Sequence, residues 1–325
     1  MKPPRRRFLC LLAGAAAVPA VVRAARAQAY PARPVRLIVG FAAGGAADIV
    51  ARLMGQWLSQ QLRQSFIIEN RPGAGSNTAT AAVVKAPPDG YTLLLLTVSN
   101  AINATLYEGL DFDILRDIAP VGSIYGSPGV MVVNPAVAAG TVAEFIAYAK
   151  AHPGQINMAS AGNGSPQHLY GELFKAMTGV ELVHVPYRSY PTALADLIGG
   201  RVQVMFDALA SAIEHIKAGR LRALGLTAAT RSPALPDLPT VGEFVPGYAA
   251  SGWQGIGAPR DTPAAIIEAL NAAIRAGLAD PQMKARIAQL GGVALPGSPA
   301  DFARLVADDT EKWGQVIKQA RIKLE

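Results

Sequence analysis

The chain has 325 residues, a formal net charge of +7, and 51% hydrophobic residues. Six of its basic side chains and none of its acidic ones lie in residues 1–29, so the other 296 residues carry a charge of only +1. A nearly neutral body lacks the positive field that binding to a phosphate backbone needs, which excludes nucleic acid as the main partner.

Residues 1–29 have the pattern of a secretory signal peptide. An arginine triplet at residues 5–7 precedes an uncharged run of 15 residues, and the segment ends with small residues up to Ala29. The run is shorter than the roughly 18 residues typical of a membrane-spanning helix. We therefore predict export with cleavage after Ala29. The arginine triplet fits both an ordinary secretory signal and a twin-arginine signal, and the export route stays open.

Cysteine and histidine usage excludes several kinds of chemistry. The only cysteine, Cys10, lies within the leader, so disulfides, thiolate catalysis and cysteine metal sites are excluded for the exported chain. None of the four histidines stands at the H-x-x-x-H or H-E-x-x-H spacing of a zinc site: His152, His168, His184 and His215. We predict no metal and no cofactor.

Strand, loop and helix alternate in the first part of the exported chain. Buried strands are predicted at residues 35–40, 66–70 and 91–97, and they are followed by small-residue loops at 41–45, 71–77 and 98–100. Helical spacing of apolar residues follows the first loop, and an alanine-rich helix follows the second. This alternation is typical of a largely parallel sheet with flanking helices.

The same alternation continues in the middle of the chain. Strands are predicted at residues 130–133, 156–160, 182–185, 202–206 and 223–227. Thr141 and Glu144 form a capping box for one helix, and Ser165 followed by Pro166 is typical of the start of another. The middle of the chain therefore predicts a second α/β unit.

The last part of the chain returns toward the first unit. A strand near residues 252–256 precedes two helices whose caps are predicted at Thr262 and Ser298. We assign these helices to the first unit, which implies chain crossings near residues 121–129 and 248–257. The predicted organisation is a signal peptide, a domain 1 and a domain 2 with a cleft between them: residues 1–29, residues 30–125 plus 253–325, and residues 126–252.

Glycine-, serine- and asparagine-rich loops follow several of these strands and lead into helices. A helix N-terminus presents unpaired N–H groups and a partial positive charge, so it suits a carboxylate or phosphate. Open α/β sheets bind ligands at the carboxyl ends of their strands. The loop at residues 40–45 lacks the Lys-Ser/Thr of a Walker motif, and the loop at 162–164 lacks the third glycine of a dinucleotide motif. A small anion other than a nucleotide is the predicted ligand.

A secreted hydrolase that uses Ser165 is an alternative of another class. Ser165 does not lie in a G-x-S-x-G motif, and no general base stands at a recognisable spacing from it. The residues favour helix capping or ligand contact for Ser165 over nucleophilic attack.

Short motifs recur along the chain from Tyr30 onward: YPARPVR at 30–36, GG with DIVAR at 44–52, ENRPGAG at 69–75, PDGYTL at 88–93, ASAGNG at 159–164, HVPY at 184–187, MFD at 205–207 and RSPALPD at 231–237. In these motifs and in their order the chain closely resembles one family, the Bug-type substrate-binding proteins of tripartite tricarboxylate transporters. The resemblance runs from Tyr30 to the C-terminus.

The resemblance implies a two-domain periplasmic binding protein of type II, a Venus flytrap without catalytic activity. Its ligand would be a small carboxylate: a di- or tricarboxylate, an amino acid or an aromatic acid. A monomer would deliver that ligand to a membrane permease with a large and a small component. A ligand sensor for a signalling partner would use the same site residues, so the sequence leaves transport and sensing open.

The family's ligand loops map onto specific positions of this chain. The predicted ligand-binding residues are Phe41, Ala43, Gly44, Gly45, Thr97, Ser99, Asn100, Ser160, Gly164, Ser165, Tyr187, Arg188, Ser189 and Asp207. Backbone capping is the alternative role for Thr97 and Asp207, and a solvated side chain is the alternative for Arg188. Two positions depart from the usual family pattern: Ala42-Ala43 stands in place of Pro-Pro, and Ser189-Tyr190 stands in place of small residues. Tyr190 either narrows the cleft, offers its ring to an aromatic acid, or points outward at the start of a helix.

Overall fold

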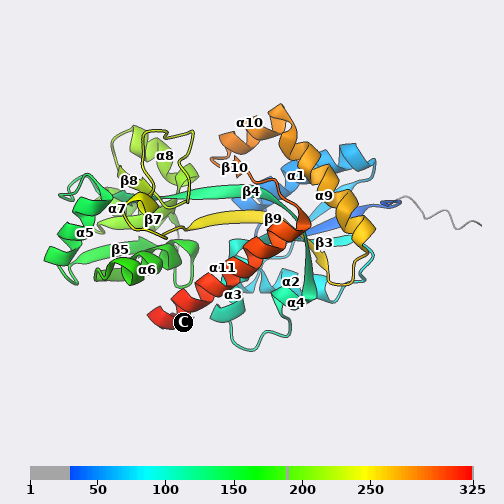
Figure 1. The fold of residues 1–325 in the computed structure, drawn as a ribbon, viewed down its shortest axis with the longest axis horizontal. Coiled ribbons are helices and arrows are strands. Elements are labelled where there is room, and N and C mark those ends of the chain that lie inside the picture. Colours follow the sequence, from blue (N-terminus) through cyan, green and yellow to red (C-terminus); the bar gives the residue numbers. More distant parts are fainter. Residues whose placement is uncertain (1–29, 188–189, 324–325) are drawn as a thin grey trace, which may run out of the picture.

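Two lobes lie side by side in the computed structural model, which describes residues 30–187 and 190–323 (Figure 1). Lobe 1 is built on strands β1, β2 and β3, and lobe 2 on strands β5, β6 and β7. The leader, Arg188 and Ser189 lie outside the described residues.

Lobe 1 consists of three parallel strands and the helices that follow them. Its elements are β1 (Val35–Val39), α1 (Ala46–Leu62), β2 (Phe66–Asn70), a 3-10 turn (Ala74–Ser76), α2 (Asn77–Val84), β3 (Thr92–Thr97), α3 (Val98–Leu106) and α4 (Ile114–Asp117). Strand β1 lies between β2 and β3. The predicted loop at residues 98–100 is wrong, because α3 begins directly after the last residue of β3.

Lobe 2 repeats this alternation. Its elements are α5 (Val142–Ala151), β5 (Ile156–Ser160), α6 (Pro166–Thr178), β6 (Leu182–Pro186), α7 (Tyr190–Ile198), β7 (Val204–Ala208), α8 (Leu209–Lys217), β8 (Arg222–Leu226) and a 3-10 turn (Val241–Glu243). Strand β5 lies between β6 and β7, and all three are parallel. The predicted N-caps at Thr141 and Ser165 are confirmed, since Thr141 accepts from the Glu144 N–H and Ser165 accepts from the His168 N–H. The predicted capping box at Thr141 is wrong in its second bond, because Glu144 Oε2 accepts from the Gly140 N–H.

Two long strands join the lobes. Strands β4 (Ile118–Val133) and β9 (Ser251–Pro259) run antiparallel to each other, β9 beside β3 and β4 beside β7. Across the described residues the order β2-β1-β3-β9-β4-β7-β5-β6 makes one sheet, with β8 and β10 also paired to β4. The sheet is thus parallel within each lobe and antiparallel between them. The predicted crossings near residues 121–129 and 248–257 fall on these two strands, while the domain boundaries stay predictions.

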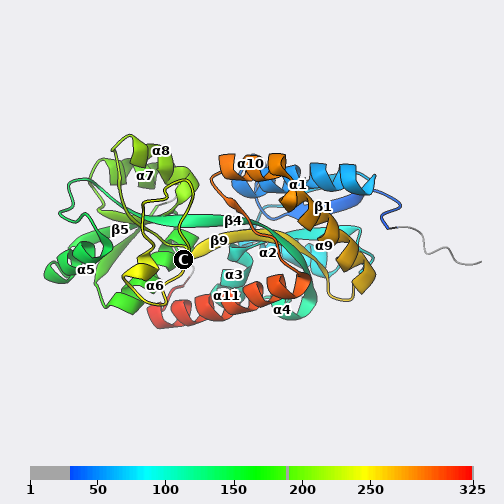
Figure 2. The same cartoon turned by 45° about the horizontal axis from the view of Figure 1, so that its top comes forward.

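The C-terminal segment covers more than lobe 1. Its elements are α9 (Ala264–Ala279), α10 (Pro281–Gln289), β10 (Val293–Ala294) and α11 (Pro299–Ala320). Helix α11 lies along the molecule and packs against both α3 of lobe 1 and α6 of lobe 2 (Figure 2). The assignment of all late helices to the first domain is therefore incomplete, and α10 and β10 were not predicted.

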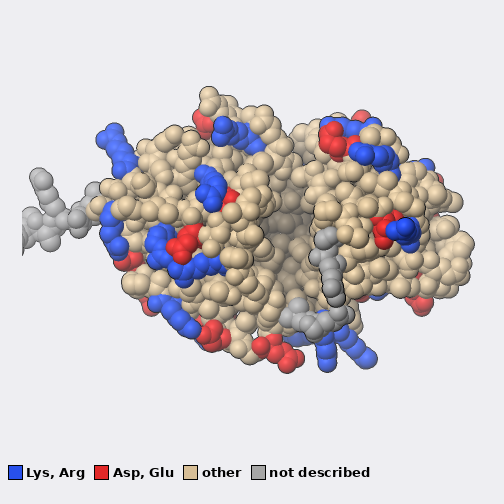
Figure 3. Space-filling view, turned by 180° about the vertical axis from the view of Figure 1, so that it is seen from behind, with Lys and Arg blue, Asp and Glu red and all other residues tan. Residues whose placement is uncertain are grey.

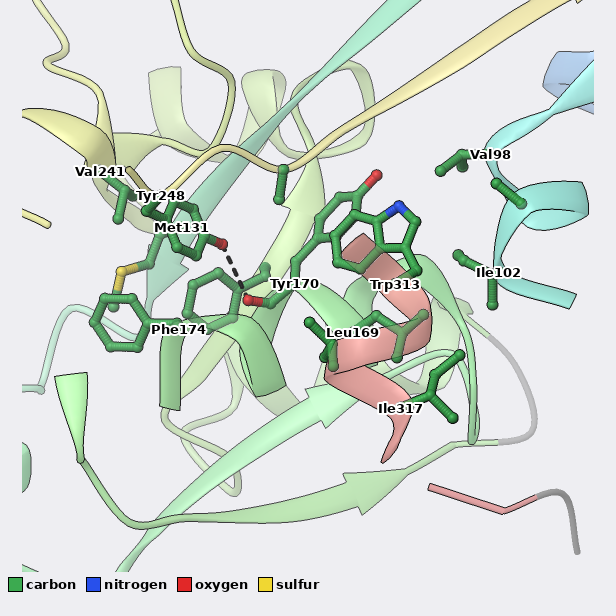
Figure 4. Packing of buried hydrophobic residues seen from close by; sticks show 14 of the residues in the cluster. Val98, Ile102, Met131, Leu169, Tyr170, Phe174, Val241, Tyr248, Trp313 and Ile317 are labelled. Atoms are coloured by element: carbon green, nitrogen blue, oxygen red, sulfur yellow. Dashed lines mark hydrogen bonds between the residues drawn. The ribbon is translucent and has the colours of Figure 1, made fainter. Parts of the chain in front are cut away.

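A single hydrophobic cluster fills the space among α3, α6 and α11 (Figure 4). Trp313 and Ile317 are four residues apart on α11 and lie on the same side of the helix. Both are buried, Trp313 completely. Residues from both lobes contribute to the cluster, among them Ile102 of α3 and Leu169 of α6. The C-terminal helix therefore packs the two lobes into one core.

Candidate functional site

The surface is hollowed between the two lobes, as the view from behind shows (Figure 3). The loop after β5 faces the helix after β3, because a Cβ atom added at Gly164 would lie 2.3 Å from Leu106 Cδ2. Strands β3 and β4 are both antiparallel to β9, so β3 runs in the direction that β4 takes toward lobe 2, whereas β7 runs against β4, toward lobe 1. The loops after the parallel strands β1, β3, β5 and β6 therefore lie at the facing ends of the lobes. The candidate site is this cleft.

The loop of Phe41 to Gly45 is held in place by Asp48, a buried residue in the first turn of α1. The Gly44 N–H donates to Asp48 Oδ2 over 2.9 Å, and Asn70 Nδ2 donates to Asp48 Oδ1 and to the Phe41 carbonyl over 3.0 Å each. Hydrogen bonding from Arg52 lowers the pKa of Asp48 to about 2, so the carboxylate is charged at neutral pH. The Gly44 N–H is therefore engaged by Asp48, while Ala43, Gly44 and Gly45 are exposed at the lobe surface.

At the end of β3 the polar residues lie mostly inside lobe 1. Thr97 and Asn100 are 6% and 3% exposed. Asn100 Oδ1 accepts from the Thr97 N–H over 2.8 Å, and Asn100 Nδ2 donates to Thr80 Oγ1 over 3.0 Å. Ser99 is partly exposed in the first turn of α3. The side chains of Thr97 and Asn100 thus fix the start of the helix, and Ser99 is the residue of the three with accessible surface.

The lobe 2 loop between β5 and α6 is held by two histidines. Gly164 has a φ of +73°, and its N–H donates to His168 Nδ1 over 3.1 Å. Ser160 is completely buried, and its Oγ lies 2.6 Å from His184 Nε2. The two imidazole rings stack with centroids 3.6 Å apart and an interplanar angle of 4°. Ser165 and Gly164 keep accessible surface, whereas Ser160 lies behind the loop.

Two tyrosines flank the end of β6 and the start of α7. The Tyr187 hydroxyl donates to Asp196 Oδ2 over 2.8 Å, and the Tyr190 hydroxyl donates to Asp207 Oδ2 over 2.6 Å. Tyr190 therefore turns its hydroxyl inward, toward β7. Asp207 is completely buried, and this burial raises its pKa to about 6. Its other oxygen accepts from the Ala208 N–H, but α8 has no side-chain cap, so the capping role left open for Asp207 is not that of a helix N-cap.

The geometry around Ser165 does not resemble that of a nucleophile. Its hydroxyl accepts from the backbone N–H of His168, while the His168 ring is bonded to Gly164 and lies near Glu172.

Within residues 30–187 and 190–323, no group of three or more His, Cys, Asp or Glu side chains could hold a metal ion. No described helix is both long and apolar enough to cross a membrane.

Sequence reasoning missed four residues that shape the candidate site: Asp48, Asn70, His168 and His184. The motif DIVAR drew attention to Asp48 only as part of a resemblance. Asp48 lies four residues after Gly44, in the first turn of α1. This spacing is the signal that could have identified it as the residue that holds the loop. The histidine stack has no such signal, because its partners are 16 positions apart on different elements.

Comparisons with known proteins agree on one family. The model of the tripartite tricarboxylate transporter family receptor matches residues 50–322. Protein BugT of Bordetella pertussis is 33% identical over 98% of this chain and 99% of its own length. The structure of R. palustris Rpa4515 with adipate is 38% identical, covers 90% of this chain and 99% of its own, and gives a TM-score of 0.77. MatC of Rhodopseudomonas palustris with bound malate is 31% identical, covers 89% and 100%, and gives a TM-score of 0.72.

Proposed function

This chain belongs to the tripartite tricarboxylate transporter receptor family, which includes the Bug proteins, and we propose that it captures a small dicarboxylate in the cleft between its lobes. The observation that carries the proposal is the meeting of the loop after β5 with the helix after β3 at Gly164 and Leu106. Two solved relatives that share the fold over about nine-tenths of the chain are Rpa4515 with adipate and MatC with bound malate, and both ligands are dicarboxylates.

Backbone N–H dipoles, rather than a buried cation, are proposed to bind the first carboxylate of the ligand. The loop at residues 41–45 leads into α1, and the loop at 161–165 leads into α6, so both place helix N-termini toward the cleft. In Figure 3 the described residues that can be seen inside the hollow are tan, and the Lys and Arg of the described residues lie outside it on this face. Exposed N–H groups and the partial positive charge of the helix ends supply the attraction.

The predicted contacts divide into two groups by accessibility. Residues with accessible surface are proposed to touch the ligand: Phe41, Ala43, Gly44, Gly45, Ser99, Gly164, Ser165 and Tyr187. The buried residues Thr97, Asn100, Ser160 and Asp207 are proposed to hold these loops in shape. Arg188 and Ser189 stay predictions that lie outside the described residues.

The wider role follows from the family. We propose that the exported chain works as a monomer in the periplasm and hands its ligand to a two-component permease. Domain 1 would comprise residues 30–125 and 253–325, and domain 2 residues 126–252. Uptake of the ligand should be lost when either the receptor or the permease is deleted. Uptake that persists without the permease, together with a changed transcriptional response, would favour the sensor instead.

A thermal-shift screen tests the ligand class. The exported chain, residues 30–325, is heated with succinate, malate, adipate, citrate, glutamate and benzoate. A ligand present at 100 times its dissociation constant stabilises the folded state by about 2.7 kcal/mol, which is a clear rise in melting temperature. We expect a dicarboxylate to give the largest shift. Shifts from none of these acids would contradict the proposal, and a shift from benzoate alone would change the ligand class.

A further inference from the structure

His168 and His184 form a stacked pair directly beneath the lobe 2 loop. His168 belongs to the first turns of α6 and is 5% exposed, and His184 lies on β6 and is partly exposed. The two rings are almost parallel and lie face to face. A face-to-face contact of this kind is compatible with neutral rings, whereas two imidazolium ions at that separation repel each other.

Each ring bonds to a different part of the same loop. His168 Nδ1 accepts from the Gly164 N–H, and His184 Nε2 is bonded to Ser160 Oγ. Ser160 Oγ in turn accepts from the Gly162 N–H over 3.1 Å. The loop from residue 160 to 164 is therefore attached to the stack at both of its ends.

The hydrogen bond from Gly164 fixes the protonation state of His168. Because Nδ1 accepts, the ring proton must lie on Nε2, which points toward Glu172 Oε1 at 3.6 Å. A protonated His168 would present an N–H at Nδ1 to the Gly164 N–H, and that bond would be lost. Gly164 has φ in the left-handed region, so the loop shape depends on such tethers.

We infer that His168 and His184 are positioning residues, which hold the lobe 2 ligand loop in its binding shape only while both rings are neutral. Acidification therefore weakens ligand binding. This inference rests on the proposed function, because it assigns the shape of a loop that touches the ligand. Neither side chain contacts the ligand in this account, and both act through the loop.

The charged groups around the pair are Glu172 and Lys175, both on α6. Lys175 Nζ lies 2.7 Å from Glu172 Oε1, so the carboxylate that faces His168 is already paired. Burial lowers the pKa of His184 to about 4, with the charges of His168 and Lys175 adding to the effect and Glu172 opposing it. The pair therefore resists taking a second proton once the first has been bound.

The test compares two variants of one residue. The Asn side chain in His168→Asn keeps an acceptor oxygen at the position of Nδ1 but cannot be protonated, whereas His168→Phe keeps a ring for the stack and loses the acceptor. Binding of the dicarboxylate from the thermal-shift screen is measured by calorimetry between pH 8 and pH 5. We expect His168→Phe to bind about tenfold more weakly at pH 7.5, the usual effect of one lost hydrogen bond.

The pH profile separates positioning from mere stabilisation. Affinity of the wild type should fall by up to about tenfold per pH unit once the pair takes up a proton, while His168→Asn should lack this fall and keep only the titrations common to both proteins, those of the ligand and of Asp207. His152→Asn, at the end of α5 and outside the pair, is the control and should follow the wild type. Equal pH profiles for the wild type and His168→Asn would overturn the inference.

A readout without ligand keeps the inference distinct from the proposed function. Amide hydrogen exchange of Gly164 in the ligand-free protein should lose protection in His168→Phe and keep it in His168→Asn. If no carboxylate binds the wild type, the proposed function fails, and this measurement still decides whether the pair holds the loop. Unchanged protection in His168→Phe would overturn the positioning role.

Discussion

The indole ring of Trp313 stacks on the phenol ring of Tyr170, with ring centroids 5.4 Å apart. Trp313 lies on the C-terminal helix α11, and Tyr170 lies on α6 of lobe 2. The backbone carbonyl of Tyr170 accepts a hydrogen bond from the buried Tyr248 hydroxyl (Figure 4). Through this contact the hydrophobic core of lobe 1 is continuous with that of lobe 2. A helix that the sequence assigns to one domain therefore stabilises both.

Substitution of Trp313 should reveal how much of the stability depends on this contact. Trp313→Ala removes a completely buried ring, and we expect it to lower the free energy of unfolding by about 3 to 5 kcal/mol. Trp313 Nε1 has no hydrogen-bond partner among the described residues, so Trp313→Phe keeps an aromatic ring and loses no bond. In urea unfolding, the free energy that Trp313→Phe loses should be less than half of the free energy that Trp313→Ala loses. Equal losses for the two variants would contradict the role of ring stacking.

Contact between Gly291 and α8 offers a test of lobe closure. A Cβ atom at Gly291 would lie 2.3 Å from Ala210 Cβ and 2.6 Å from Ala210 Cα, so Gly291→Ala must push α8 away. We expect weaker binding of the dicarboxylate and a larger radius of gyration by X-ray scattering.

Gly219→Ala is the matched control for that variant. Gly219 has a φ of +67° and Gly291 a φ of +71°, but a Cβ atom at Gly219 would meet no atom within 4 Å. Both variants should lose about 1 kcal/mol of stability from the left-handed backbone, and only Gly291→Ala should lose affinity. Unchanged affinity in Gly291→Ala would show that this contact is absent from the ligand-binding form.

Asp207 should make the protein less stable at neutral pH than at mildly acidic pH. Its pKa is raised from 3.8 to about 6 by burial, so between these values the folded state holds a proton that the unfolded state has released. Stability from this group therefore falls as pH rises through that range and is fully lost above about pH 6. Asp207→Asn should be more stable than the wild type by about 2 kcal/mol at pH 7.5.

Urea unfolding at several pH values checks the sign of this effect. The difference between Asp207→Asn and the wild type should shrink as pH falls from about 6, and it should become independent of pH only below about pH 3, where the wild-type carboxyl is protonated in both states. Other titrating groups affect both proteins equally and cancel in the difference. A difference that does not change with pH would contradict a buried carboxyl with a raised pKa.

Local signals predicted most of the strands and several helix starts. The predicted cap at Thr262 is wrong, because its hydroxyl donates to the Pro259 carbonyl and α9 has no side-chain cap. Ser165 before Pro166 gave the start of α6, and Ser298 with Asp301 gave the capping box of α11, because capping chemistry acts over three residues. The loop predicted at residues 98–100 was wrong because serine and asparagine are common in turns and equally common at helix starts. Asp280 before Pro281 carried the same kind of signal for α10, which was overlooked.

The candidate site was predictable only in part. Strand-to-helix loops rich in small residues identified the two faces of the cleft, since that pattern is local. The tethers that shape these loops join distant positions, such as Asn70 to Asp48 and His184 to Ser160. These pairs depend on strand register and helix packing, which one sequence does not specify. Burial likewise separates Ser160 from Ser165 only once the fold is known.

A calorimetric titration with the carboxylate from the thermal-shift screen tests the central claim most directly. Ala43 is exposed in the loop before α1, so Ala43→Asp adds a like charge where the ligand carboxylate is proposed to bind. Ala138→Asp adds the same charge at an exposed position beyond the end of β4 that lies away from the cleft. The account predicts one site per chain, an affinity at least about tenfold weaker in Ala43→Asp, and an unchanged affinity in Ala138→Asp. Equal affinities in all three proteins would contradict it, because the ligand would then bind elsewhere.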